Sequence, residues 1–111
     1  MTHWETIWSF KTARFRITCD VTPEDSDPAD HFFFEENVKA IRSGALDWFI
    51  VRMCVTLDGY EIAADYLGGC AYKSAHDFAH KCRNDYFRDM VRDAVQQARR
   101  TLTNAPKLRA V

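Results

Sequence analysis

The sequence of 111 residues lacks the marks of an exported or membrane-bound protein. Its first residues, Met1 to Glu5, carry neither a basic segment nor an apolar one, so no secretory signal is expected there. No apolar run approaches the roughly 20 residues that a membrane-spanning helix needs. We therefore expect no membrane partner and a cytoplasmic location.

Paired cysteine motifs are also missing. The four cysteines are scattered and none forms a C-x-x-C pair, and the sequence has no secretory context. Free cysteine is commonly buried as a small hydrophobic residue. The sequence therefore predicts reduced, buried thiols rather than a disulfide framework at Cys19, Cys54, Cys70 and Cys82.

The common catalytic motifs are absent: a phosphate-binding glycine loop, a zinc-protease histidine pair with glutamate, and a nucleophile elbow. The nearest approach to a nucleophile is Cys70, which follows Gly68-Gly69 and precedes His76 by six residues. Strand geometry explains the two glycines more simply. We therefore expect a protein that is not an enzyme.

A metal site is suggested only weakly. His76 and His80 are four residues apart, which places them on one face of a helix, and Cys82 follows closely. A structural zinc normally takes four ligands in paired spacings from two segments, and only Cys70 is available as a fourth. Two solvent-facing histidines are the simpler interpretation, so we expect neither a metal nor another cofactor.

The chain contains no internal repeat and no low-complexity segment. Its 47% hydrophobic residues, including eight phenylalanines, supply enough apolar surface for one core. We expect a single domain over residues 1–111, with residues 104–111 forming a frayed tail because they show no pattern.

Two β-hairpins are predicted. Apolar and polar residues alternate from Arg14 to Val21, which places one side of this strand in the core and the other in water, with Ile7–Phe10 as its partner strand. The second hairpin joins Trp48–Thr56 to Tyr60–Leu67 through Asp58-Gly59, a strong two-residue turn signature. Gly68-Gly69 then predicts a bend, a bulge or a close backbone approach before Cys70–Tyr72.

Three helical segments complete the predicted fold. One covers residues 35–43 and ends at Gly44, and a short one after Ser74 carries Phe78. The last helix, which Asn84 can cap, has an apolar stripe at Phe87, Met90, Val91, Ala94, Ala98 and Leu102. The sequence thus predicts an α+β domain, in which a four-stranded antiparallel sheet of two hairpins is packed by a long C-terminal amphipathic helix and one or two short helices.

Charge is balanced at −1 overall but is unevenly distributed. Seven acids and no Lys or Arg lie between Asp20 and Glu36, whereas nine bases and four acids lie between Lys73 and Arg109. Such asymmetry can arise from two solvated faces of opposite sign, or it can mark a contact surface.

Each charged segment suggests a different partner. An acidic segment with neighbouring aromatics fits a basic groove on a protein or ribonucleoprotein, through Asp25, Asp27, Asp30, Phe33, Glu35 and Glu36. The alternative is nucleic-acid binding by the last helix. Aspartates interleave with its bases and weaken their field, so an ordinary solvent-facing helix also accounts for Arg88, Arg92, Arg99 and Arg100.

The segments Leu57–Tyr72 and Tyr86–Ala94 resemble a family of small proteins carried by phages and bacterial mobile elements. The resemblance covers about half of the chain and implies a biological setting rather than a mechanism. Small non-catalytic proteins in that setting include anti-CRISPR inhibitors, which mostly occupy a surface of the host's effector complex. The sequence-based hypothesis is therefore a phage-type inhibitor of a bacterial defence complex, monomeric or homodimeric, acting in the cytoplasm of the host.

Overall fold

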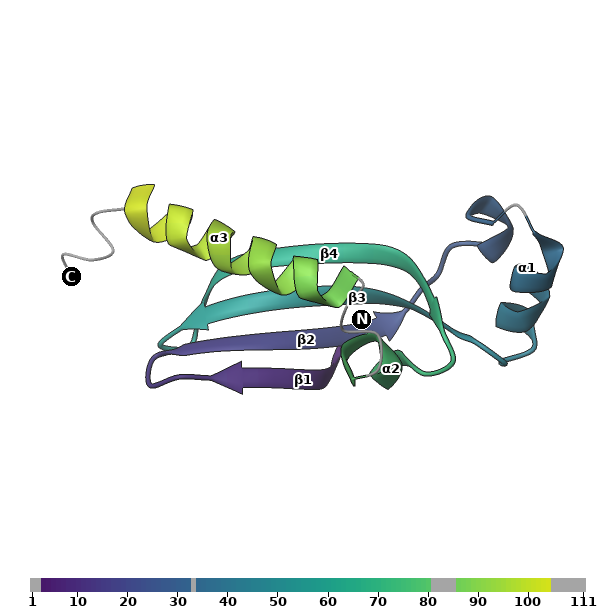
Figure 1. Cartoon of the computed structure of the whole chain (residues 1–111), viewed down its shortest axis with the longest axis horizontal. Helices are drawn as coiled ribbons and strands as arrows, with labels where there is room; N and C mark the ends of the chain where they lie inside the picture. The colour runs from purple at the N-terminus through teal and green to yellow at the C-terminus, as the bar shows by residue number, and fades with distance from the viewer. Residues whose placement is uncertain (1–2, 33, 81–85, 105–111) are drawn as a thin grey trace.

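The computed structural model describes residues 3–32, 34–80 and 86–104. A four-stranded antiparallel sheet in the order β1-β2-β3-β4 carries the helices α2 and α3 on one face (Figure 1), which confirms the predicted α+β class. The strands are β1 (Glu5–Lys11), β2 (Phe15–Pro23), β3 (Asp47–Leu57) and β4 (Tyr60–Tyr72). The helices are the 3-10 helix η1 (Pro28–Asp30), α1 (Glu35–Arg42), α2 (Ala75–His80) and α3 (Arg88–Asn104).

Several sequence-based predictions concern positions outside the described residues. These are residues 105–111 of the predicted frayed tail, the aromatic contact at Phe33, the helix cap at Asn84 and the thiol of Cys82. Asn104, the first residue of that predicted tail, is instead the last residue of α3.

The β3–β4 turn has the predicted conformation. Asp58 and Gly59 both have positive φ, at 51° and 88°, as a type I′ turn requires. The backbone N–H of Asp58 donates to the carbonyl of Arg14, and the two side chains form an ion pair at 2.8 Å. These contacts join the tips of the two hairpins.

A β-bulge in β1 directs two consecutive residues into the core. Thr6 pairs with Asp20 and Trp8 pairs with Cys19, so Ile7 is the extra residue. Ile7 is buried, and the Trp8 ring meets the ring of Phe87 edge-on at 5.0 Å. The strand therefore supplies two large apolar groups to the same face of the sheet.

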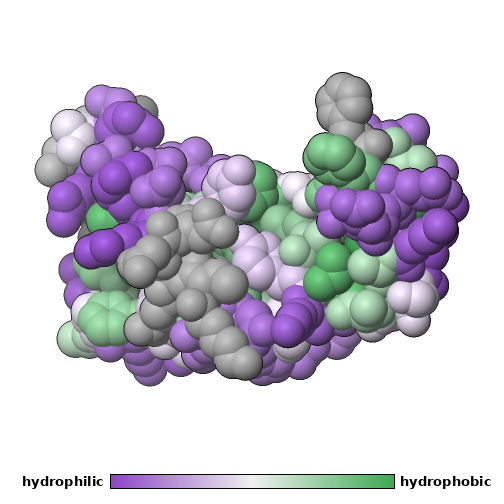
Figure 2. All heavy atoms as spheres, turned by 45° about the vertical axis from the view of Figure 1, so that its right-hand side comes forward, coloured by the Kyte–Doolittle hydropathy of each residue, from purple (hydrophilic) through white to green (hydrophobic). Residues whose placement is uncertain are grey.

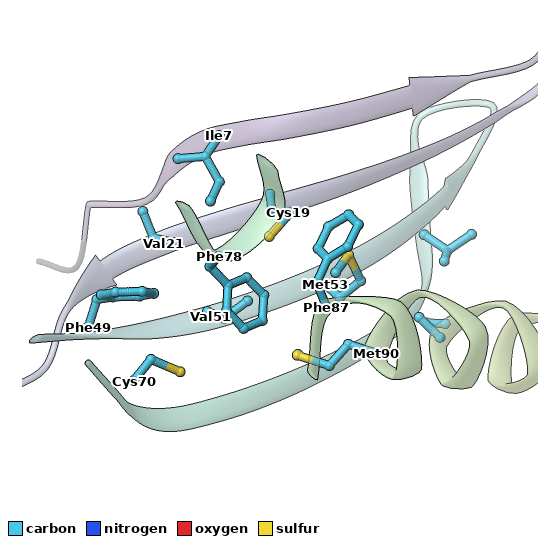
Figure 3. Close-up of a cluster of buried hydrophobic side chains, with 14 of the residues drawn as sticks. Ile7, Cys19, Val21, Phe49, Val51, Met53, Cys70, Phe78, Phe87 and Met90 are labelled. Atoms are coloured by element: carbon cyan, nitrogen blue, oxygen red, sulfur yellow. The ribbon is translucent and has the colours of Figure 1, made fainter. Parts of the chain in front are cut away.

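The core lies between the sheet and the α2–α3 layer (Figure 3). Alternate residues of β3, Phe49, Val51, Met53 and Val55, are buried on one face, and Phe78 of α2 is fully covered against this face. Within α3, Ala94 and Ala98 are 0% and 4% exposed, and these small side chains allow the helix to approach the strands closely. The predicted apolar stripe of α3 is thus confirmed. Across the described residues, no helix has the length and apolarity that a membrane crossing requires.

The outer face of the sheet differs from the prediction. The polar side of β2 was expected to be solvated, but Asp20 is only 4% exposed. Its carboxylate accepts hydrogen bonds from the Thr6 hydroxyl at 2.7 Å and from Arg52 Nη2 at 3.0 Å. The Arg52 guanidinium in turn lies 4.2 Å from the centre of the Trp4 ring. These partners compensate for removing the carboxylate from water, which is why the prediction was wrong.

Arg52→Met leaves the buried Asp20 carboxylate without its cation, and we expect the unfolding free energy to fall by about 2 kcal/mol. The double variant Asp20→Val/Arg52→Met removes both charges and should recover most of that loss. Chemical denaturation of the two variants measures both effects. Equal instability of the single and double variants would contradict this role for the ion pair.

Candidate functional site

The connection between β2 and β3 projects beyond the end of the sheet as a separate unit, which we call the acidic lobe (residues 24–46; Figure 1). It contains η1 and α1, and the buried residue of α1, Val38, lies outside the main core cluster. Two cations, Lys39 and Arg42, accompany its six acids, which are Glu24, Asp25, Asp27, Asp30, Glu35 and Glu36. The sequence segment predicted to bind a partner is thus physically distinct from the sheet core.

Trp48, at the start of β3, anchors the lobe to the sheet. Its indole N–H donates to the carbonyl of Ser26 at 2.9 Å, and its backbone carbonyl accepts from the N–H of Glu24 at 3.1 Å. The rings of His31 and Phe32 pack on the Trp48 ring with centroid distances of 5.2 and 5.8 Å. Sequence periodicity identified Trp48 only as an apolar strand residue, because its partners lie far away in the chain.

Gly68 and Gly69 form the second half of this junction. They lie opposite Ile50 as a β-bulge in β4, in agreement with the sequence prediction. Gly69 has a φ of 67°, and its N–H donates to the Glu24 carboxylate at 2.8 Å. A Cβ atom at Gly69 would lie 3.1 Å from the His31 ring, and one at Gly68 would lie 3.1 Å from the Glu24 carboxylate. Both glycines therefore permit the close approach of the lobe.

Two opposing effects determine the pKa of the Glu24 carboxylate. Burial favours its neutral form, but hydrogen bonds from the backbone N–H groups of Gly69, Ser26 and Asp25 outweigh it and lower the pKa of Glu24. The residue is therefore ionised at neutral pH and joins the two chain segments. It was absent from the predicted site residues, although it lies in the same acidic run.

The predicted binding acids divide into two groups. Asp25, Asp30, Glu35 and Glu36 are exposed, with Glu35 only loosely paired to Lys39 at 3.9 Å along α1. Asp27 instead accepts from the N–H of Ala29 and from Arg42 Nη2, both at 3.0 Å, and these contacts lower its pKa. Asp27 thus links η1 to α1 and acts as a positioning residue.

The aromatic residues of the lobe differ in their exposure to solvent. Phe33, the predicted aromatic contact, lies outside the described residues, and Phe32 packs on Trp48. Phe34, which precedes α1, is 66% exposed. The sequence predicted Phe33 as the aromatic contact; of its two neighbours Phe32 and Phe34, which the structure describes, Phe34 is the one exposed to solvent.

A hollow of about 400 Å³ lies beside the lobe. Figure 2 shows the surface dipping between two raised parts of the molecule, and the hollow is lined by Phe32, Tyr86 and the β4 segment 67–72. Tyr86 is 57% exposed there. The acidic lobe is therefore bordered by an aromatic surface that sequence periodicity did not reveal.

The arginines of α3 form the second predicted surface. One face of α3 carries three of them at positions i, i+4 and i+11, which are Arg88, Arg92 and Arg99. Arg100 lies outside this face. Arg92 is 3.3 Å from the Asp89 carboxylate and 3.6 Å from that of Asp93. The expected weakening of the basic field by neighbouring aspartates is therefore present at the centre of this face.

The His76 and His80 rings stack with their centroids 5.9 Å apart. Cys70 is buried in the core, and burial, assisted by the charge of Glu24, raises the pKa of its thiol to about 12. His80 Nε2 is 2.9 Å from the carbonyl oxygen of Ile7, to which it is hydrogen-bonded. Within residues 3–32, 34–80 and 86–104, no three His, Cys, Asp or Glu side chains gather as a metal site would require. The described cysteines, Cys19, Cys54 and Cys70, are free and buried, as predicted.

Comparisons of the chain with protein-family models, curated proteins and solved structures find no match. Functional inference therefore depends on the surface itself.

Gly69→Ala should destabilise the junction more than a matched glycine substitution elsewhere in the lobe. Gly44, which has a φ of 84° and has no atom within 4 Å of the position that an added methyl group would take, is that control. An alanine at positive φ costs about 1 kcal/mol at either site. Gly69→Ala adds the steric conflict with His31, so its unfolding free energy should fall further in chemical denaturation. Equal losses would show that the close approach is unimportant.

Glu24 should make stability depend on pH. Because folding lowers its pKa, its stabilisation is complete above the unfolded value, about pH 4.3, and is lost as the pH falls through the folded value. The Tm values of the wild type and Glu24→Gln should therefore differ at pH 7, and the difference should shrink as the pH falls below about 4.3. A difference in Tm that is constant over this range would contradict the assignment.

Proposed function

We propose that this protein is a non-enzymatic binding protein whose acidic lobe contacts a basic surface of a protein or ribonucleoprotein. In the setting that the sequence resemblance implies, its role is that of a phage-type inhibitor of a bacterial defence complex. One observation carries the proposal: exposed carboxylates are displayed on a lobe that a partly buried junction of hydrogen bonds and ring contacts holds outside the core.

The availability of the carboxylates supports this function. Asp25, Asp30 and Glu36 form no ion pair with any other described residue, so their charge remains available to a partner. The Asp27–Arg42 ion pair and the Trp48 contacts already restrict the lobe before binding. Such preorganisation lowers the entropy lost on association, and clustered charge of one sign accelerates encounter with an oppositely charged surface.

The aromatic groups supply the apolar part of such an interface. Phe34 is exposed directly before α1, whose first turn carries Glu35 and Glu36. Tyr86 contributes to the lining of the neighbouring hollow. Exposed aromatic side chains next to charged groups are typical of the residues that dominate protein–protein binding energy.

The nucleic-acid alternative has less support from the side-chain contacts. Arg92, in the middle of the basic face of α3, is neutralised locally by two aspartates. Nucleic-acid phosphates would therefore have to be bound by the other arginines of α3, without a contribution from Arg92.

The decisive comparison uses two charge-reversed variants. The first converts Asp25, Asp30, Glu35 and Glu36 to Lys and retains Asp27, because Asp27 holds the lobe together. The second converts Arg88, Arg92, Arg99 and Arg100 to Glu. Wild type and both variants are used for affinity capture from bacterial lysate, with mass spectrometry to identify the protein that is retained. We expect the first variant to lose that protein and the second to keep it.

Circular dichroism provides the control that both variants remain folded. Retention of the captured protein by the lobe variant would refute the acidic-surface proposal. A gel shift with nucleic acid at low salt that disappears only in the helix variant would favour the alternative function instead.

A further inference from the structure

The outer face of the sheet, opposite α2 and α3, carries a row of cations near the hairpin turns. Figure 1 shows both helices on one face, so the strand residues that alternate with the buried ones point to the other face. On this outer face the Cα partners Lys11, Arg16 and Thr56 follow one another across β1, β2 and β3. Together with Arg14 they line a hollow of about 520 Å³ at the hairpin tips, which we call the tip hollow.

The tip hollow has an excess of positive charge. Its acid, Asp58, is paired with Arg14 at 2.8 Å. Lys11 and Arg16 form no ion pair with any residue that the structure describes. Glu61, which pairs with Thr56 at the far edge of the sheet, accepts a hydrogen bond from a thiol of β3. The charge of the hollow is therefore complementary to an anionic ligand.

An exposed aromatic side chain lies on the same face, further from the turns. Tyr66 is the Cα partner of Arg52 and is 58% exposed. The Trp4 ring meets the Tyr66 ring edge-on at 6.3 Å, and the Arg52 guanidinium lies 4.2 Å from the centre of the Trp4 ring. These contacts support Tyr66 from one side and leave it accessible to a ligand from the other.

The tip hollow and Tyr66 are close enough to contact one extended ligand. Arg16 and Asp20 are four residues apart in β2, and Asp20 shares its row across the sheet with Arg52 and Tyr66. The hollow and the ring are therefore separated by about 13 Å along the strands and about 10 Å across them. The row between them has short side chains, which are Ser9, Thr18, Cys54 and Ala64. No long side chain of that row blocks the path.

We propose that the outer face of the sheet binds single-stranded nucleic acid, with phosphates in the tip hollow against Lys11 and Arg16 and a base stacked on Tyr66. Sequence-independent binding of single strands combines these two interactions, over sites of about 4 to 16 nucleotides. The outer face is separate from the arginines of α3, because that helix covers the opposite face of the sheet (Figure 1). It also lies apart from the acidic lobe, so this activity does not depend on the proposed function.

Fluorescence anisotropy with a labelled oligothymidine of about 12 nucleotides, measured at several salt concentrations, tests the role of the cations. The Kd of the wild type should rise with salt. Lys11→Gln/Arg16→Gln removes two phosphate contacts, so the slope of log Kd against log salt should fall by about 1.4. The matched control Arg88→Gln/Arg99→Gln removes the same charge from α3 and should leave the slope unchanged.

Substitutions of Tyr66 test the stacking. Tyr66→Ala should raise the Kd for the oligothymidine about tenfold, because stacking on one base is lost. Tyr66→Phe retains the ring and should bind as the wild type does. With a duplex of the same length, whose bases are not free to stack on the protein, Tyr66→Ala should have no effect. Circular dichroism checks that each variant is folded.

No binding by the wild type at low salt and about 0.1 mM protein would overturn the proposal, since even non-specific nucleic-acid binding is normally observed at that concentration. Equal effects of the two glutamine variants, or wild-type affinity of Tyr66→Ala, would overturn it as well. Charge reversal of the acidic lobe should not weaken binding of the oligothymidine. Failure of this proposal can therefore be distinguished from failure of the proposed function.

Discussion

The carboxylate of Glu24, which accepts the N–H of Gly69 at 2.8 Å, holds together two parts of the chain that the core does not join. No described residue of the acidic lobe belongs to the main apolar cluster, so its placement depends on a few polar and aromatic contacts with Trp48 and the β4 bulge. Gly69 has positive φ in this bulge, and a Cβ atom there would lie 3.1 Å from the His31 ring, which would have to shift. The position of the surface proposed to bind partners therefore depends on the β-bulge in β4.

The residues that stabilise this small domain and those proposed to bind a partner lie in different parts of it. The inner face of the sheet, α2 and α3 supply the apolar core, and the outer face supplies the Asp20–Arg52 network beneath Trp4. The exposed carboxylates Asp25, Asp30 and Glu36 lie on the acidic lobe, outside that core. Substitutions there should leave the core intact, so the proposed binding surface can be tested separately from stability.

The sequence predicted features that local rules control. The Asp58-Gly59 turn, the helix ending before Gly44 and the apolar stripe of α3 each depend on a short window, and the structure has all three. Features that need distant partners escaped prediction. Asp20 is buried because Arg52, 32 residues away, neutralises it. The bulge at Gly68-Gly69 was predicted, but its partner Glu24, which lies 45 residues before Gly69, was not. The acidic composition of the segment was enough to predict four exposed residues, which are Asp25, Asp30, Glu35 and Glu36. The structural role of Asp27 could not be predicted, because it depends on the position of Arg42 in the fold.

The central claim is that the acidic lobe is held in place before any partner binds. Native-state hydrogen exchange measured by NMR tests it most directly, at the Gly69 amide and the Trp48 indole N–H, which donate to the lobe. We expect both protons to be protected to a degree similar to the central amides of β3, because they exchange only when the junction opens. Exchange of both at the rates of an unstructured peptide, with β3 still protected, would show that the lobe moves independently and would contradict the account.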